Sequence, residues 1–452
     1  MATREELYLP DDCWESILKI FLNDCDNNRC FLPSLSVVSK QFLSVTDSCK
    51  LSLTISDQTL PLLPRLFQRF TKLTSLDLTG ITGDQDALLT QISCFPLQVK
   101  SLSVSSNDQW TIPANGLRIF SQKITTLTSL VCSNIFLISK SDLYLVADSF
   151  PLLEELELAI KVDSYDDSEM CGITLALPKL RKVNLSGSYH IYDSSLLHLC
   201  KNCEFLEEVV MFDCKNLTAI GIASAIRERP NLRSFYFTLS EAMNIGMEMN
   251  DSLRSMKRLS CLDLSFSCIS DQLLLSLGNK GVYLRRLVLR HCTGYSYLLD
   301  VNKCHCISDE GIVEVLRSCK IVHLNLSSCE NVNLHAMNFQ VPMLEVLNLS
   351  YTRTDDKTLD AISKSCSGLL HLDLEECINV SDMGVKQVIE NCTRLKEINL
   401  RYCGNMAADV DIWLAMVLSR PSLRKIKAPS HFYPQIYTKW KPLLDHGCFL
   451  CP

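Results

Sequence analysis

The sequence has no long hydrophobic run, no excess of basic residues and no export signal. No stretch approaches the roughly 18 uncharged apolar residues that a membrane-spanning helix needs. Lysine and arginine number 44 against 51 aspartates and glutamates, and the net charge of −7 gives no general attraction to nucleic acid. The first residues, MATREELYLPDD, lack the basic and then apolar pattern of a signal peptide. We therefore expect an intracellular protein, in the cytoplasm, the nucleus or both, that binds neither membranes nor nucleic acid.

Signals for catalysis and for metal binding are also missing. There is no glycine-rich phosphate loop and no nucleophile elbow, and the nine histidines show no metal-ligand spacing. Cys304, His305 and Cys306 are adjacent, so they cannot easily surround one tetrahedral zinc ion, and the CxxC of Cys448 and Cys451 has no second ligand pair. We expect no cofactor, no metal and no enzymatic activity of the chain's own.

The 23 cysteines are many for a chain without a signal peptide. In a reducing compartment they remain thiols, and a free cysteine behaves as a small buried hydrophobe. Several recur at fixed positions of a repeat, as packing residues do. The 47% of hydrophobic residues can form a large core and make wholesale disorder improbable.

A leucine-spaced motif, LxxLxL with other apolar residues substituted, recurs along most of the chain. Its copies begin at Leu73, Val99, Leu127, Leu153, Leu180, Leu206, Leu232, Leu259, Leu284, Ile321, Leu344, Leu369, Leu395 and Leu423. Successive copies start 23 to 28 residues apart, except for one step of 37 residues after Leu284. LSLTIS at Leu51 is a degenerate candidate for a first copy.

The spacing predicts short strands joined by return segments. The last two leucines of each motif alternate with period two, so they point to one face of a strand. The return segments often have helical spacing, as in residues 381–392, where Val385, Val388 and Ile389 form an apolar face behind a helix start at Ser381. A single unit cannot bury its apolar face, whereas stacked units share one core. The prediction is an α/β solenoid with a parallel concave sheet and outer helices.

Cysteines and an (I/V)SDxG segment mark the longer template of this repeat. One cysteine follows the strand by three residues, at Cys214, Cys292, Cys329, Cys377 and Cys403. A second one precedes the next motif by three residues, at Cys203, Cys366 and Cys392. The segments ISDEG and VSDMG begin at Ile307 and Val380. The template resembles the cysteine-containing class of leucine-rich repeats, which implies a horseshoe solenoid and is typical of intracellular F-box proteins.

Residues 9–49 lack the repeat and have helical spacing instead. Trp14, Ile17, Leu18, Phe21 and Leu22 form one stripe, with Asp12 as the expected N-cap, and Leu35, Val38, Phe42 and Leu43 form another. Two or three short helices over about 40 residues make a marginal domain, so a partner surface is expected. The alternative is a helical cap that shields the first repeat.

This segment resembles the F-box, in the order Leu-Pro, acidic pair, Ile-Leu helix and hydrophobic run. Ser39 and Phe42 stand where the family often has Cys and Trp. The resemblance implies binding to a Skp-type adaptor through Leu9, Pro10, Trp14, Ile17, Leu18, Phe21, Leu35, Val38, Ser39, Lys40 and Phe42. It also implies an F-box in residues 1–50, a solenoid in 51–428 and a cap or tail in 429–452.

By this resemblance the chain is a non-catalytic substrate-recognition subunit of an SCF-type ubiquitin ligase. The adaptor joins it to a cullin-RING ligase, and the repeats select a target protein for ubiquitination. Two alternatives stay open. One is a binding-only scaffold without ubiquitination. The other is a small-molecule-dependent receptor, because plant auxin and jasmonate receptors share this layout.

The x positions of LxxLxL face the concave surface, where acidic and basic rows alternate. A candidate target patch combines an aromatic residue with cations, at Arg233, Tyr236, Arg285, Arg286 and His323. The 37-residue step indicates an insertion near residues 293–306, where Tyr295 and Tyr297 are further candidates. The alternatives are a solvated surface whose neighbouring rows compensate each other, and a neutral insertion.

Overall fold

The computed structural model of the 452-residue chain describes residues 9–24, 31–105, 111–135, 140–160, 177–187, 191–238, 247–269, 271–278, 283–294, 309–329, 332–406, 418–429 and 449–451. The chain forms two compact units, Met1–Ser188 and Tyr189–Pro452. Their division lies inside the repeat array. The domain boundaries expected near residues 50 and 428 therefore stay predictions.

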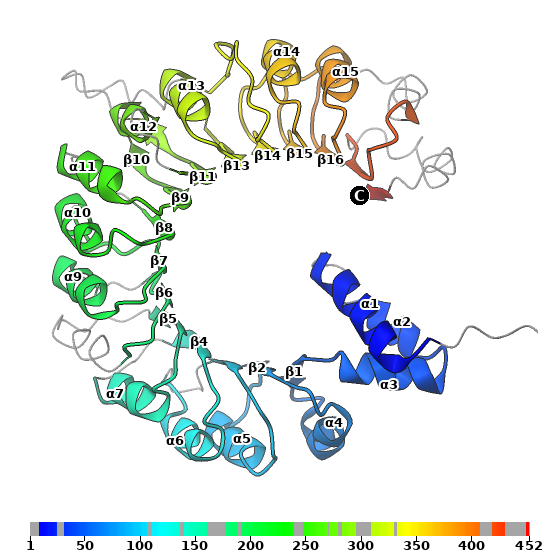
Figure 1. The fold of residues 1–452 in the computed structure, drawn as a ribbon, viewed down its shortest axis with the longest axis vertical. Coiled ribbons are helices and arrows are strands. Elements are labelled where there is room, and N and C mark those ends of the chain that lie inside the picture. The colour runs from blue at the N-terminus through cyan, green and yellow to red at the C-terminus, as the bar shows by residue number, and fades with distance from the viewer. Residues whose placement is uncertain are drawn as a thin grey trace, which may run out of the picture. The chain divides into compact units, whose positions relative to one another are not determined.

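The first unit begins with three helices and continues with strands that alternate with helices (Figure 1). Its helices are α1 (Asp11–Asp24), α2 (Phe31–Ser36), α3 (Lys40–Ser48), the 3-10 turn η2 (Leu60–Leu62), α4 (Leu63–Arg69), α5 (Gln85–Ile92), α6 (Ala114–Lys123) and α7 (Lys140–Ser149). Its strands are β1 (Ser52–Ser56), β2 (Ser75–Gly80), β3 (Ser101–Ser105), β4 (Ser129–Ile135), β5 (Glu155–Ile160) and β6 (Lys182–Asn184).

The second unit continues the same alternation with shorter strands. Its helices are α9 (Asp193–Asn202), α10 (Ala219–Glu228), α11 (Met247–Ser255), α12 (Asp271–Gly278), α13 (Asp309–Ser318), α14 (Asp356–Ser365) and α15 (Asp382–Asn391). Its inner strands are β7 (Glu208–Met211), β8 (Ser234–Phe237), β9 (Cys261–Asp263), β11 (Arg286–Val288), β13 (His323–Asn325), β14 (Val346–Asn348), β15 (His371–Asp373), β16 (Glu397–Asn399), β17 (Lys425–Lys427) and β18 (Phe449–Cys451). A separate pair is formed by β10 (Cys268–Ile269) and β12 (Thr293–Gly294).

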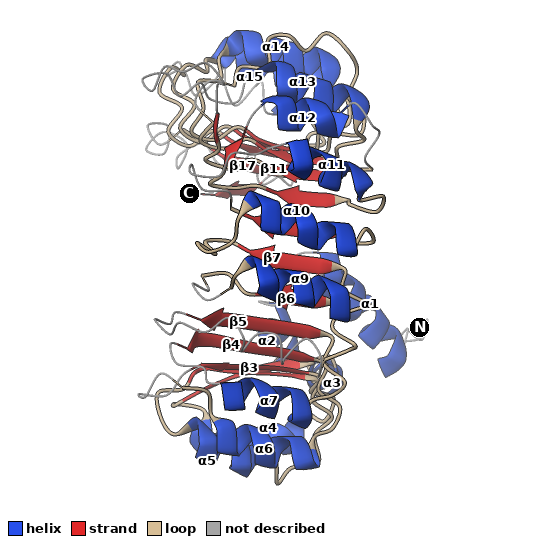
Figure 2. Ribbon diagram, turned by 90° about the vertical axis from the view of Figure 1, so that its left-hand side faces the viewer, coloured by secondary structure: helices blue, strands red, loops and turns tan. Residues whose placement is uncertain are grey.

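Within each unit the strands pair in parallel, in the register of the sequence repeat. Leu347 of β14 lies beside Leu372 of β15, and Leu372 lies beside Ile398 of β16. Leu372 is 2% exposed, whereas His371 and Asp373 on either side of it face away from the core. The helices cover the core side of the strands and leave the other side open (Figures 1 and 2). This is the leucine-rich-repeat solenoid fold that the spacing predicts.

A tight turn follows seven of the described strands of the second unit. The Asn348 side chain accepts a hydrogen bond from the backbone N–H of Ser350 at 2.9 Å, and Tyr351 then adopts a φ of 58°. The same left-handed turn occurs after six other strands, at Asp213, Phe266, His291, Ser328, Glu376 and Tyr402. Each of these residues carries a conformational cost of about 1 kcal/mol or more, which the neighbouring repeats must offset. Backbone hydrogen bonds between the turns of neighbouring repeats offset part of this cost. For example, the Tyr351 N–H donates to the carbonyl of Glu375 at 2.7 Å.

The recurring cysteines hold this turn against the preceding repeat. The Cys377 thiol lies 3.1 Å from the Leu349 carbonyl, and the Cys403 thiol lies 3.2 Å from the Leu374 carbonyl. Burial raises the pKa of Cys403 to about 12, so its thiol keeps its proton at neutral pH. The cysteines whose side chains the structure describes are free thiols, and of these Cys13 and Cys94 are exposed. Cys377 and Cys403 act as buried packing residues that also donate a weak hydrogen bond.

The SDxG segment interlocks consecutive helices. Ser381 is the N-cap of α15, and Asp356, the first residue of the preceding helix α14, accepts from the Ser381 N–H at 2.9 Å and from its hydroxyl at 2.5 Å. A Cβ on Gly384 would lie 2.5 Å from Asp356 Oδ1, so only glycine leaves room for this carboxylate. Asp193 binds Thr218 in the same way. The helix predicted to start at Ser381 is confirmed. The SDxG motif at its start forms a contact with the preceding repeat.

The predicted N-cap of the first helix is wrong by two residues. The Pro10 carbonyl accepts from the N–H groups of Cys13 at 3.0 Å and Trp14 at 3.3 Å, so α1 begins at Asp11. Asp12 therefore lies in the first turn, where its charge still faces the positive end of the helix dipole.

Strands at both ends of the array extend the sheet beyond the clear motifs. The degenerate copy at Leu51 forms β1, in which Leu53 lies beside Leu76 of β2. Near the other terminus, Leu450 of β18 lies beside Ile426 of β17. Of the predicted insertion at 293–306, only the strand β12 lies within the described residues.

Candidate functional site

The three N-terminal helices form a small module with its own apolar centre. Leu18, Val45 and Cys49 are buried there, and the partly buried Trp14, Leu32 and Leu35 pack against them. Phe42 contacts Trp14, with ring centroids 4.8 Å apart. The cluster joins α1, α2 and α3, so the apolar stripes seen in the sequence serve first to hold the helices together.

The Leu-Pro entry is tied to the start of α3. The Gln41 side-chain amide donates to the Leu9 carbonyl at 3.0 Å and to Asp11 Oδ1 at 2.9 Å. Ser39 caps α3 by accepting from the Phe42 N–H at 3.1 Å. Two segments some thirty residues apart in the sequence thus meet at one end of the module.

The module is also tied to the first repeats. Glu15 of α1 accepts from the Ser48 hydroxyl at 2.5 Å and forms an ion pair with Lys72 at 3.0 Å. Asp47 of α3 forms an ion pair with Arg69 of α4 at 2.8 Å. Such partly exposed ion pairs stabilise weakly, about 1 kcal/mol or less each, but they fix the orientation of the module on the first repeats.

The residues predicted to bind an adaptor fall into two groups. Leu18 is buried, and Leu9, Trp14, Ile17, Leu35 and Phe42 are partly buried, so their contribution is largely to the shape of the module. Pro10, Val38, Ser39 and Lys40 are exposed and can contact a partner directly. The side chain of Phe21 lies outside the described residues.

Sequence reasoning missed two apolar side chains on the surface of this module. Val37 is 83% exposed beside Val38, and Ile20 is 64% exposed on α1. Ile20 does not belong to the apolar stripe of the first helix. An apolar residue outside that stripe is the sequence feature that could have predicted an exposed apolar side chain. These exposed aliphatic groups are candidates for contact with a partner, because contiguous exposed apolar groups mark protein-binding surfaces.

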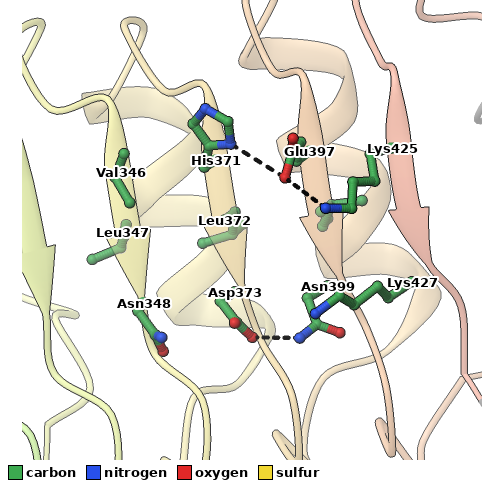
Figure 3. A pocket seen from close by; sticks show the side chains of 11 residues that line it. Val346, Leu347, Asn348, His371, Leu372, Asp373, Glu397, Asn399, Lys425 and Lys427 are labelled. Carbon is green, nitrogen blue, oxygen red and sulfur yellow. Dashed lines mark hydrogen bonds and ion pairs between the residues drawn. The ribbon is translucent and has the colours of Figure 1, made fainter. Parts of the chain in front are cut away.

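The open face of the second unit carries charged rows that largely neutralise each other. His371, Glu397 and Lys425 lie side by side on β15, β16 and β17, with Glu397 3.5 Å from the histidine and 3.7 Å from the lysine (Figure 3). In the next row, the Asn399 amide donates to Asp373 at 2.9 Å. These groups line a shallow cavity of about 260 Å³.

The structure brings most of the predicted target patch together across β8, β9, β11 and β13. Arg286 lies beside His323 on one neighbouring strand and beside Cys261 on the other. The Cys261 thiol lies 3.3 Å from the hydroxyl oxygen of Tyr236. Arg233 is engaged with Glu207 at 3.8 Å. Among the predicted patch residues, Tyr295 and Tyr297 lie outside the described residues, and the assignment of the patch stays a prediction.

Electrostatics single out the centre of this patch. The pKa of His323 is lowered from its ordinary value by partial burial and by the positive charge of Arg286, with a smaller contribution from Arg285. A histidine beside two arginines is therefore mostly neutral at pH 7.

Neither a metal centre nor a membrane span occurs in the described part of the chain. No group of three or more histidine, cysteine, aspartate or glutamate side chains in these ranges could hold a metal ion. No helix there is long and apolar enough to cross a membrane.

The fold is that of leucine-rich-repeat proteins, and part of the chain is similar to a known F-box protein. No family model matches the chain. The F-box protein SKIP19 of Arabidopsis thaliana is 30% identical over 121 residues, 24% of this chain, and the chain covers only 37% of that protein's length. The repeat fold and this similarity together support an F-box/leucine-rich-repeat protein.

Solved structures agree on the fold. The TLR13–ssRNA13 complex aligns with a TM-score of 0.51 and 15% identity, over 84% of this chain and 56% of that chain. Rad7 in its yeast complex with Elc1 aligns over 93% of this chain and 94% of that chain, with a TM-score of 0.44 and 15% identity. The alignment with the TLR13–ssRNA13 complex supports the solenoid fold.

Proposed function

We propose that this chain is the substrate-recognition subunit of an SCF-type ubiquitin ligase. In this role the N-terminal module binds a Skp-type adaptor, the adaptor connects to a cullin-RING ligase, and the open face of the repeats binds a target protein. The chain supplies no catalytic group. It acts by holding the target near the ubiquitin carrier, which raises their effective concentration.

The observation that carries the proposal is the exposed apolar surface of the N-terminal module. A cap that only shielded the first repeat would turn its apolar side chains toward that repeat. Here Val37, Val38 and Ile20 are exposed although the module already has a core and ion pairs to the first repeats. The similarity to an F-box protein adds support from the sequence.

Co-purification from cells tests the proposal with a pair of matched variants. Ile20→Glu and Ile220→Glu place the same change on helices, at two isoleucines that are both 64% exposed, one in the module and one on α10 of the repeats. Adaptor and cullin should be lost with Ile20→Glu and kept with Ile220→Glu. Targets should remain bound to both variants.

A second variant tests the Leu-Pro entry. Leu9→Ala/Pro10→Ala should also lose the adaptor and keep the targets. If the wild-type chain co-purifies with targets but never with the adaptor, the proposal is wrong and the chain is a binding-only scaffold. Adaptor that remains on both altered modules would show that this surface is not the binding site.

A further inference from the structure

One repeat of the second unit presents three arginines in a short stretch. Arg285 and Arg286 are exposed at the start of β11, and Arg290 is exposed just beyond its end. Val288, between Arg286 and Arg290, is 7% exposed and lies between Asp263 and Asn325 of the neighbouring strands. We name Arg285, Arg286 and Arg290 the arginine track.

The arginine track has no carboxylate partner among the described residues. Several other cations on the open faces do have one, as in the ion pairs Lys182–Glu155, Arg233–Glu207 and Lys425–Glu397. The nearest acidic neighbour in register is Asp263, which lies beside Val288. It is 9% exposed and already accepts from the N–H and the hydroxyl of Ser265. The positive charge of the track is therefore available to a ligand.

A cavity at the end of the track has the lining that an anionic group requires. It measures about 440 Å³, and its walls include Arg290, His291, Asn325, Ser328 and Tyr351, with no carboxylate among its described walls. The backbone of Arg290 is fixed, because its carbonyl accepts from the N–H of Phe266 at 2.8 Å. Guanidinium, hydroxyl and amide groups are the donors that bind carboxylates.

Exposed aromatic rings border this cavity. The Phe266 ring is 56% exposed, stacks on His291 with centroids 5.1 Å apart and lies 5.7 Å from the Arg290 guanidinium carbon. Tyr351 is 53% exposed. Arginine and aromatic residues together are the usual anchors of protein interfaces.

The surroundings of the track limit the width of the ligand across the strands. Glu208 on β7 and Glu345 beside β14 bound it on the two sides. The five strand spacings from β7 to β14 add up to about 24 Å. A polyanion that ran across the strands would meet these carboxylates on both sides, whereas an acidic segment that follows β11 lies between them.

We propose that the arginine track binds a short acidic segment of a partner protein, with aspartate or glutamate side chains on the three guanidinium groups. Arginine pairs with carboxylates through two parallel hydrogen bonds, which gives geometric selectivity as well as affinity. The apolar residues of such a segment would pack on Val288 and on the rings of Phe266 and Tyr351. The inference rests on the proposed function in one respect, that this partner is the recruited target.

Fluorescence polarisation with the purified full chain tests the proposal. The probe is a fluorescein-labelled peptide of about nine residues with glutamate at alternate positions, and the same peptide with glutamine is its reference. The glutamate peptide should bind, more weakly at high salt because screening weakens exposed charge pairs, and the glutamine peptide should not. Arg285→Glu/Arg286→Glu should weaken binding by at least about tenfold, the effect of losing one charge-assisted hydrogen bond.

A matched control carries the same change in charge elsewhere in the unit. Arg317→Glu/Lys364→Glu alters two exposed cations of α13 and α14, which are paired with Glu314 and Asp360. This control should bind the peptide like the wild type. The milder Arg290→Gln should still weaken binding measurably, and it is the informative variant if the double substitution fails to fold.

The outcomes separate this inference from the proposed function. If the wild-type chain co-purifies with the adaptor but does not bind the glutamate peptide, this inference alone is overturned. Peptide binding without any adaptor overturns the proposed function alone. Equal loss in the control variant, or tighter binding of a single-stranded oligonucleotide that displaces the peptide, overturns the assignment of the track to an acidic protein segment.

Discussion

The contact of Asp356 with Ser381 and Gly384 in the next helix predicts that Gly384→Ala, which adds one methyl group, strongly lowers the stability of the fold. In an ordinary helix this change stabilises by up to about 1 kcal/mol, because alanine loses less backbone entropy on folding. Here the new Cβ would lie 2.5 Å from Asp356 Oδ1 and 2.9 Å from Leu359 Cδ1. Atoms at these distances overlap, so the carboxylate must move.

Moving that carboxylate breaks its two hydrogen bonds to Ser381. A hydrogen bond to a charged group contributes about 1.5–3 kcal/mol, so the loss of two outweighs the gain from alanine. We expect Gly384→Ala to lower the free energy of unfolding by about 2–4 kcal/mol. Gly404→Ala is the matched control, because a Cβ there meets no atom within 4 Å.

Urea unfolding followed by circular dichroism measures the change, and hydrogen exchange locates it. Exchange should accelerate in α14 and α15 of the Gly384 variant and remain unchanged in the Gly404 variant. Asp356→Ala should remove most of the penalty of Gly384→Ala when the two are combined, a coupling that a double-mutant cycle reads directly. Equal stability of Gly384→Ala and wild type would refute the interlock as a source of stability.

Two further predictions concern the buried layer of the repeats. Iodoacetamide at neutral pH should modify the exposed Cys94 in the native protein and leave Cys403 unmodified until the chain unfolds, as mass spectrometry of the peptides can show. Native modification of both thiols would contradict the assigned burial. Leu372→Ala should cost about 2–5 kcal/mol in urea unfolding, whereas Leu62→Ala, at a 45% exposed site, should change little.

The strands and the helix starts of the repeats were predictable because local sequence patterns within each repeat specify them. The alternation of apolar and polar residues places Leu372 inward, and a serine before an acidic residue marks the helix start at Ser381. The register between strands follows as well, since equivalent motif positions lie side by side. Arg286 beside His323 is therefore implied by the repeat alone.

Other features depend on side-chain contacts in three dimensions, which the sequence pattern does not reveal. Asp263 might equally have paired with an arginine, but its bonds to Ser265 withdraw it from the open face. The need for glycine at Gly384 arises from a carboxylate of the preceding repeat, about 28 residues away in the sequence. The exposure of Ile20 results from the packing of three helices, which no single helical stripe reveals.

His323 links the charge of the open face to its proposed ligand. Its pKa is lowered by partial burial and by Arg286, so protonation of His323 opposes folding and the stability it contributes is lost as pH falls below about 6.5. Arg286→Gln should raise this pKa, as a histidine NMR titration would show. A bound acidic segment should raise it too, because its carboxylates favour the imidazolium. By linkage the glutamate peptide must then bind more tightly as pH falls through the histidine's titration range. Peptide binding that leaves the His323 titration unchanged would place the ligand away from the arginine track.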